Sequence, residues 1–395
     1  MRHLCKSTCA LAILGALTVL GVASCADGAA TAPVTTELAL RDDMRQLWTQ
    51  HVLWTRVFLI DSIAGLADAD AANKRLLQNQ VDIGDAIRPF YGDSAGDELT
   101  ALLLQYVTGA AAMVAAVKTG DRSALGVVNT AWYANAHEIA VFLADTSPEL
   151  ALADLDPIMR AHAYQVEAEA TARVQGDWTM DVATHDTLAV RSLEMADALS
   201  GAIARQFPDT VDTSATQSNG DLHRAMRRLW EHQVSWTRIF LVDSIAGLPD
   251  TGAARARLLQ NQVDIGNAVK PFYGEEEGNT LTALLHDHVA LTDRVVLDAK
   301  NRDTTDLTIA SDLWYANGDR VAAFFAAGSP SVPLADARAM MRMHLDYTLA
   351  QANARLGADW PTDIAAFDAA EAHVLDMSDA LGDSMVAQFP QPFSR

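Results

Sequence analysis

The chain has 395 residues, half of them hydrophobic, and a formal net charge of −22 at pH 7. Phosphate binding draws on clustered Lys and Arg, so this acidic excess argues against a nucleic-acid partner and against binding an anionic membrane through the protein surface. Only three cysteines occur. Two of them, Cys5 and Cys9, lie in a predicted leader, so we expect no disulfide, no cysteine-ligated zinc and no cysteine nucleophile in the mature chain.

Residues 1–25 have the pattern of a bacterial lipoprotein signal peptide. Basic residues precede an apolar run that is short for a membrane span, and small residues lead up to Cys25. The pattern predicts export, lipidation of Cys25 and anchoring on the extracytoplasmic side of a membrane through the lipid alone. Residues 26–36 would then form a flexible tether. The alternative is an ordinary signal peptide that is cleaved nearby, with Cys25 incidental.

The remaining chain is a tandem duplication. The ten residues RLLQNQVDIG at 75–84 recur unchanged at 257–266, and the same offset of 182 positions holds without a gap through the other matched motifs. We therefore predict two homologous domains at 37–208 and 222–392. The segment 209–221 contains few large apolar residues and is predicted to be a solvated linker. The duplication also acts as an internal comparison, because a polar residue present in both copies has been kept twice.

Both copies are predicted to be all-α. Apolar residues recur at spacings of three and four, Ala and Leu dominate, and no alternating strand pattern occurs. Because each repeat is long enough to close its own core, two tandem helical bundles are favoured over a solenoid. The second copy repeats the plan of the first, in which we expect six helices at about 38–65, 70–88, 96–118, 122–145, 150–174 and 178–206.

The first helix of each copy carries a polar stripe that should face the bundle interior. His51 lies in this stripe, whereas the matched residue of the second copy is Gln233. One turn of the same helix also offers an indole and a guanidinium, which could grip a ligand or instead form a structural ion pair with an acid on a neighbouring helix. The candidates for this grip are Trp54, Arg56, Trp236 and Arg238.

One histidine is present in both copies, as His162 and His344. Two turns further along the same helical face lies Glu169, which is matched by Gln351. Only the first copy therefore keeps a His/Glu pair that could supply two ligands to a site between helices.

The identical ten-residue segment contributes a further matched acid, Asp82 in the first copy and Asp264 in the second. These carboxylates could bind a ligand, or they could join a structural hydrogen-bond network with nearby Gln and Asn side chains. The glycine two residues later, Gly84 or Gly266, would let another helix approach closely.

Together these side chains form nitrogen and oxygen ligand sets suited to a divalent transition metal, and facing helices are where bundles build metal sites. For each histidine alone, a core or surface residue with a satisfied hydrogen bond is the alternative. The sequence has no HExxH motif, no Glu-x-x-His pair of the di-iron bundles, no phosphate loop and no nucleophile elbow. The candidate metal ligands are His51, Asp82, His162, Glu169, Asp264, His288, Asp319 and His344.

The motifs LWxxHxxWTR, RLLxNQxDIG, PFYG, WYAN and QFP resemble a bacterial all-helical family whose members usually carry a single copy of this repeat. The resemblance covers both domains. It implies histidines at the positions of His51, His288 and His162 or His344, and acids at those of Asp319 and Glu169. Members carry automatic labels such as glycosyltransferase and acetylglutamate kinase, but a wholly helical chain lacks the sheet that those nucleotide-using folds need.

From the sequence we therefore expect a lipid-anchored extracytoplasmic protein that binds a small ligand or a metal ion within its helical bundles. One alternative is a metal-dependent enzyme of the cell envelope. Another is a structural or protein-interaction lipoprotein without a site.

Overall fold

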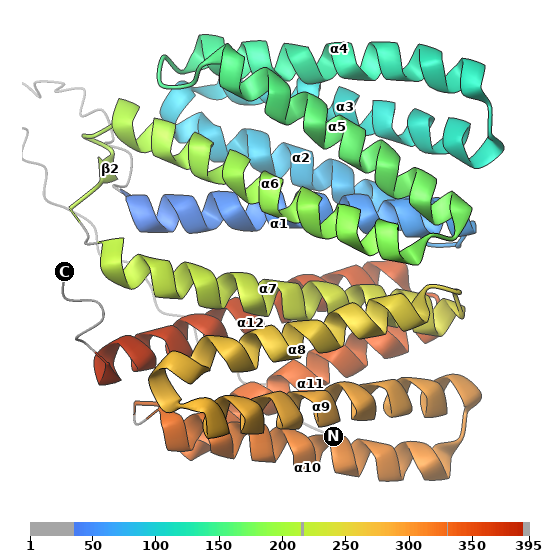
Figure 1. Cartoon of the computed structure of the whole chain (residues 1–395), viewed down its shortest axis with the longest axis vertical. Helices are drawn as coiled ribbons and strands as arrows, with labels where there is room; N and C mark the ends of the chain where they lie inside the picture. The colour runs from blue at the N-terminus through green and yellow to red at the C-terminus, as the bar shows by residue number, and fades with distance from the viewer. Residues whose placement is uncertain (1–34, 215–216, 330, 390–395) are drawn as a thin grey trace, which may run out of the picture. The chain divides into compact units, whose positions relative to one another are not determined.

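The computed structural model describes residues 35–214, 217–329 and 331–389. These residues form an all-α protein with twelve helices and two short strands (Figure 1). The predicted signal peptide, the candidate lipidation site Cys25 and all of the predicted tether except Thr35 and Thr36 lie outside the described residues. The duplication predicted from the sequence is visible as two successive sets of six helices.

The first six helices follow the predicted plan, with ends that differ by a few residues. They begin at caps such as Asp121 and Asp177, whose carboxylates accept hydrogen bonds from the backbone N–H groups of Ala124 and Met180. The helices are α1 (Glu37–Ala64), α2 (Ala69–Tyr91), α3 (Asp93–Thr119), α4 (Arg122–Thr146), α5 (Leu152–Gln175) and α6 (Trp178–Gln206).

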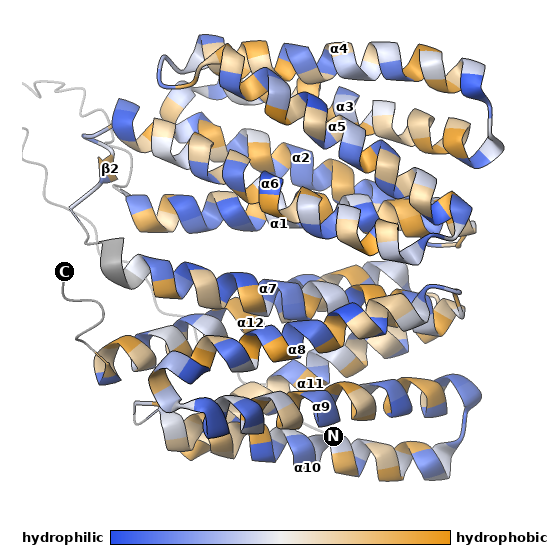
Figure 2. Ribbon diagram, in the orientation of Figure 1, coloured by the Kyte–Doolittle hydropathy of each residue, from blue (hydrophilic) through white to orange (hydrophobic). Residues whose placement is uncertain are grey.

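The second six helices repeat the first set at matched positions. They are α7 (Gln217–Ala246), α8 (Thr251–Tyr273), α9 (Glu275–Asn301), α10 (Thr304–Gly328), α11 (Leu334–Leu356) and α12 (Trp360–Gln388). In each set, every helix packs against the next one and the sixth returns to pack against the first, so each set closes a bundle. The largest apolar cluster fills the first bundle and continues into the second through residues such as Trp236, Phe240 and Phe367. Apolar residues recur along the helices, as Figure 2 shows.

The predicted linker is more ordered than we expected. Thr35–Thr36 (β1) pairs in parallel with Val211–Asp212 (β2), and α7 begins at Gln217, five residues before the predicted start of the second domain. Val211 is buried, which explains why this part of the segment is held against the bundle. Asp209, residues 212–214 and Asp221 are exposed, whereas Val211 and Gly220 are buried, so the predicted linker is solvated at most of its described positions but includes a short strand and the start of α7.

Helix α3 has the length and mean hydropathy of a membrane-spanning helix. Core helices of soluble proteins pass the same test, and the apolar positions Leu99, Leu103 and Val107 of α3 are buried within the first bundle. The apolar character of α3 is therefore explained by its place in the core.

A close helix crossing confirms the expectation for the glycine of the repeated segment. A Cβ atom on Gly84 of α2 would lie 1.9 Å from Oγ1 of Thr100 and 2.7 Å from the backbone oxygen of Gly96, both on α3. Gly266 repeats this arrangement between α8 and α9, where the matched distances are 1.9 Å to Thr282 and 2.6 Å to Gly278. No side chain fits at either crossing, so both copies need glycine there.

We predict that Gly84→Ala lowers the free energy of unfolding by about 1–3 kcal/mol, because the two helices must separate to admit the methyl group. Chemical denaturation followed by circular dichroism measures this change. Gly126→Ala is the matched control, because Gly126 is a helical glycine with open space around its Cβ position. The control should raise stability by about 0.5–1 kcal/mol. Equal effects of the two substitutions would contradict the crossing.

Candidate ligand sites in the bundle interiors and at their junction

The interior of the first bundle contains a cluster of His51 from α1, Tyr106 from α3 and His162 from α5, all of them buried. The ring centres of the two histidines lie 5.2 Å apart, and Oη of Tyr106 shares a hydrogen bond with Nδ1 of His162 at 2.8 Å. Burial lowers the pKa of His51 to about 4 and that of His162 well below its ordinary value. Both imidazoles are therefore neutral at pH 7 and can offer a lone pair.

A glutamine of the repeated segment orients the first histidine. Nε2 of Gln80 donates to the backbone oxygen of Leu76 at 2.8 Å and to Oδ1 of Asn79 at 3.1 Å, and it lies 3.1 Å from Nδ1 of His51. In the second bundle, Nε2 of Gln262 donates to Oε1 of Gln233 and to the backbone oxygen of Leu258. The repeated segment therefore points one amide into each bundle interior, where it holds the residue at position 51 or 233.

The second bundle contains the matched cluster, formed by His288 from α9 and His344 from α11. Their ring centres are 5.9 Å apart, and burial lowers the pKa of His288 to about 4 and that of His344 to about 3. Nδ2 of Asn317 donates to the backbone oxygen of Leu284, so its Oδ1 is the acceptor in the 3.0 Å hydrogen bond to Nδ1 of His288. The proton of His288 is therefore on Nδ1, and its Nε2 carries a lone pair.

The remaining predicted metal ligands do not join these clusters. Glu169 lies two helical turns, about 10 Å, from His162 along α5 and accepts a 2.7 Å ion pair from Arg56 instead. Asp82 and Asp264 point toward solvent and accept hydrogen bonds from Gln78 and Gln260, four residues earlier. Asp319 pairs with Arg342 near the surface. Among the described residues, no group of three or more His, Cys, Asp or Glu side chains is placed to hold a metal ion.

The predicted ligand grip is a structural ion pair instead, which was the alternative. Arg56 is almost fully buried and binds Glu169 and Asp181, while its guanidinium stacks over Trp236 of the other bundle at 5.0 Å. Arg238 mirrors this arrangement: it binds Asp363 and stacks over Trp54 at 5.1 Å. These four predicted residues therefore join the two bundles, and their charged and aromatic groups already have partners.

Two further arginines, Arg173 and Arg355, tie the bundles together in a reciprocal way. Arg173 of the first bundle binds Asp250 of the second at 2.6 Å, and Arg355 of the second binds Asp68 of the first at 2.6 Å. Each also binds the aspartate that holds the stacked arginine, Asp181 or Asp363. These residues were not predicted from the sequence. Their presence at matched positions in both copies could have identified them as candidates.

Two buried aspartates complete the junction, Asp61 on α1 and the matched Asp243 on α7. Neither carboxylate has a hydrogen-bond partner among the described residues, and both are fully buried. Burial raises the pKa of Asp61 to about 8 and that of Asp243 well above its ordinary value. A neutral Asp61 leaves Arg238 and Arg355 balanced by Asp363 and Asp68.

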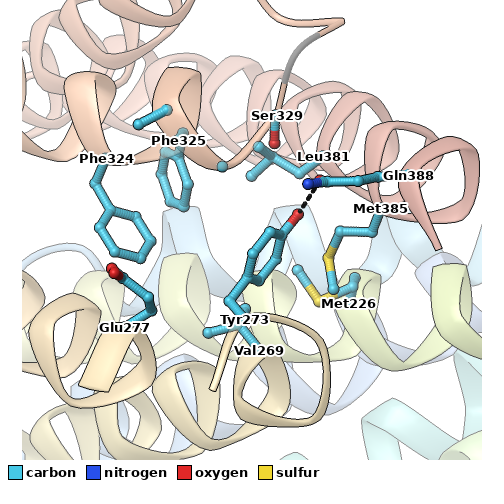
Figure 3. Close-up of a pocket in the computed structure, with 12 residues that line it drawn as sticks. Met226, Val269, Tyr273, Glu277, Phe324, Phe325, Ser329, Leu381, Met385 and Gln388 are labelled. Atoms are coloured by element: carbon cyan, nitrogen blue, oxygen red, sulfur yellow. Dashed lines mark hydrogen bonds between the residues drawn. The ribbon is translucent and has the colours of Figure 1, made fainter. Parts of the chain in front are cut away.

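One end of the second bundle contains a cavity of about 230 Å³. Figure 3 shows its wall of Phe, Met, Leu and Val side chains, and the hydrogen bond in which Oη of Tyr273 donates to Oε1 of Gln388 at 3.1 Å. Glu277 and Ser329 add a carboxylate and a hydroxyl to the lining. The apolar residues labelled in Figure 3 are Met226, Val269, Phe324, Phe325, Leu381 and Met385.

The matched end of the first bundle has larger residues at two positions. Gly328 and Val269, which line the cavity, correspond to Thr146 and Ile87. Oγ of Ser147 also donates to Gln206 at 2.9 Å in the first bundle, in addition to the matched tyrosine bond. Two other lining residues, Phe325 and Glu277, correspond to the smaller Leu143 and Ala95, so the two ends differ in shape and chemistry.

Comparison with known proteins adds no assignment. No family model, no curated protein and no solved structure matches the chain.

We predict that Asp61→Asn raises stability at pH 8 by an amount on the order of a few kcal/mol. The folded protein keeps a proton on Asp61 up to about pH 8, whereas the unfolded chain releases it near 3.8. Stability from this group is therefore full below about pH 4 and falls as the pH rises toward 8. Denaturation at pH 5, 6.5 and 8 should give a shallower fall for the variant.

The matched control for this measurement is Asp70→Asn, which changes an exposed aspartate near the start of α2. The control should follow the wild-type pH profile. If Asp61→Asn also runs parallel to the wild type, the carboxyl is ionised in the folded protein and the raised pKa is wrong.

Proposed function

We propose that the chain is an exported, lipid-anchored protein that binds a small, mostly apolar molecule in its second bundle. The observation that carries this proposal is the 230 Å³ cavity between α7, α8, α10 and α12. A concave apolar site with a few convergent polar groups is the usual form of a small-molecule site. Export and lipidation at Cys25 remain predictions from the sequence pattern.

The cavity lining indicates the chemical class of the ligand. Its walls are phenyl, thioether and aliphatic groups, which favour an apolar body. The hydroxyl of Tyr273 donates to Gln388, so the tyrosine oxygen can still accept a hydrogen bond and the amide NH₂ of Gln388 can donate one. A cavity of this size is smaller than the roughly 300–1,000 Å³ typical of drug-sized ligands. We therefore expect a compact molecule with one hydroxyl or carbonyl group.

A second candidate function, transition-metal binding, is favoured by a separate observation. Two neutral histidines lie close together inside each bundle, and one member of each pair, His162 or His344, occupies a matched position of the duplication. No observation favours the metal-dependent enzyme over simple binding. The third candidate is a structural or protein-interaction protein without a site. It would be supported if neither the apolar probe nor the metal ion binds.

The cavity predicts that Gly328→Leu weakens binding of N-phenyl-1-naphthylamine, an apolar fluorescent probe, by at least about tenfold. A Cβ atom on Gly328 would meet Tyr273 at an ordinary contact distance of 3.5 Å, so the helix tolerates the change while the leucine fills the cavity. Probe fluorescence is titrated with the mature protein, and competition by medium-chain alcohols then ranks ligands.

Thr146→Leu supplies the matched control, because Thr146 is the corresponding residue of the first bundle. This variant should bind the probe like the wild type. No probe binding by the wild type, or equal binding by all three proteins, would remove the cavity as the site.

A further inference from the structure

The two histidine clusters become informative when they are compared position by position. The matched pairs are His51 with Gln233, Tyr106 with His288, and His162 with His344. The structure brings all three positions together in the first bundle, and it brings His288 and His344 together in the second. Each bundle therefore has histidine at two of the three matched positions, and the position without histidine differs between the two bundles.

We infer that these three matched positions are the ligand positions of a transition-metal site in each bundle, with two imidazoles present per bundle. The inference rests on the second candidate function above. It adds the ligand set of each bundle.

The spacing of the imidazoles fits a shared ion. Two imidazoles bound to one tetrahedral ion at metal–nitrogen distances of about 2.0–2.1 Å have ring centres roughly 5 Å apart. The observed separations are 5.2 Å in the first bundle and 5.9 Å in the second. Nε2 of His162 and Nδ1 of His344 are buried and have no hydrogen-bond partner among the described residues. A buried ring nitrogen without a partner is what an ion would satisfy.

The surroundings of the histidines also resemble those of metal ligands. A metal-bound histidine usually donates its other ring N–H to an oxygen atom, which fixes the tautomer. Nδ1 of His288 makes this bond to Oδ1 of Asn317, and Asn317 is itself held by Leu284. Nε2 of His288 is left with a free lone pair as the ligand atom.

The third position, the one without histidine, carries an oxygen atom in both bundles. In the first bundle it is the phenol of Tyr106, which is 2.8 Å from His162. In the second bundle it is Gln233, whose oxygen already accepts a hydrogen bond from Gln262. Imidazole with an oxygen donor favours Zn²⁺, Cu²⁺, Ni²⁺ or Co²⁺ over Ca²⁺ or Mg²⁺, which prefer all-oxygen sites.

The test adds the missing histidine instead of only removing the ones present. Gln233→His completes three imidazoles in the second bundle, and Tyr106→His completes them in the first. The full mature chain, without a histidine affinity tag, is titrated with Zn²⁺ by calorimetry and with Co²⁺ by visible absorption. We expect each variant to bind one ion at least about tenfold more tightly than the wild type, with a tetrahedral Co²⁺ spectrum.

Gln260→His is the matched control, because it adds a histidine at an exposed position of α8. It should leave the affinity unchanged. His162→Ala and His344→Ala should each remove the ion from their own bundle, with folding checked by thermal melting.

The outcomes separate this inference from the function on which it rests. If Zn²⁺ binds the wild type but neither the added nor the removed histidines change its affinity, metal binding stands and the three ligand positions are wrong. If no variant binds Zn²⁺ or Co²⁺, including the two with a completed triad, both the ligand positions and the metal-binding function fall.

Discussion

The arrangement of the two bundles depends on arginines that are buried against the partner bundle. Arg56 and Arg238 each stack on a tryptophan of the opposite bundle, while Arg173 and Arg355 each reach across to an aspartate of the opposite bundle. Buried guanidinium groups are costly unless every charge is paired. The carboxylates must therefore come from fixed places on several helices at once, and this requirement sets the register of α1 against α7.

Features of the fold that depend on local sequence were predictable, whereas contacts between distant helices, such as those of the buried arginines, were not. The duplication, the helix number and the glycine crossing depend on local pattern and on the offset of 182 positions, and the structure confirms them. The role of Arg56 depends on which helix lies opposite it. The helical pattern places Arg56 on the inward face of its helix. It does not show whether the guanidinium meets a ligand or Asp181, because Arg56 and Asp181 are more than a hundred residues apart in the chain.

The candidate site was predictable to a similar extent. His162 and His344 were selected because they recur, His51 because it occupies the inward stripe and His288 because of the family resemblance, and they do form clusters. Glu169 was selected because it shares a helical face with His162, but such a face extends over many ångströms of length. Asp82 was selected because it recurs as Asp264, and recurrence does not show which way a side chain points. The cavity could not be predicted, because its lining comes from several helices whose side chains meet only in the folded structure.

The reciprocal bridges are those of a two-fold symmetric dimer, in which each subunit presents the same patch to the other. In such a dimer both subunits have the same sequence, so any substitution changes both symmetric halves of the interface. Here a single polypeptide carries both halves, and the matched residues of the two halves differ. His185 and Glu169 of the first bundle correspond to Phe367 and Gln351 of the second. Fusion has thus released this contact from enforced sameness, and one end carries the imidazole of His185 where the other carries the phenyl ring of Phe367.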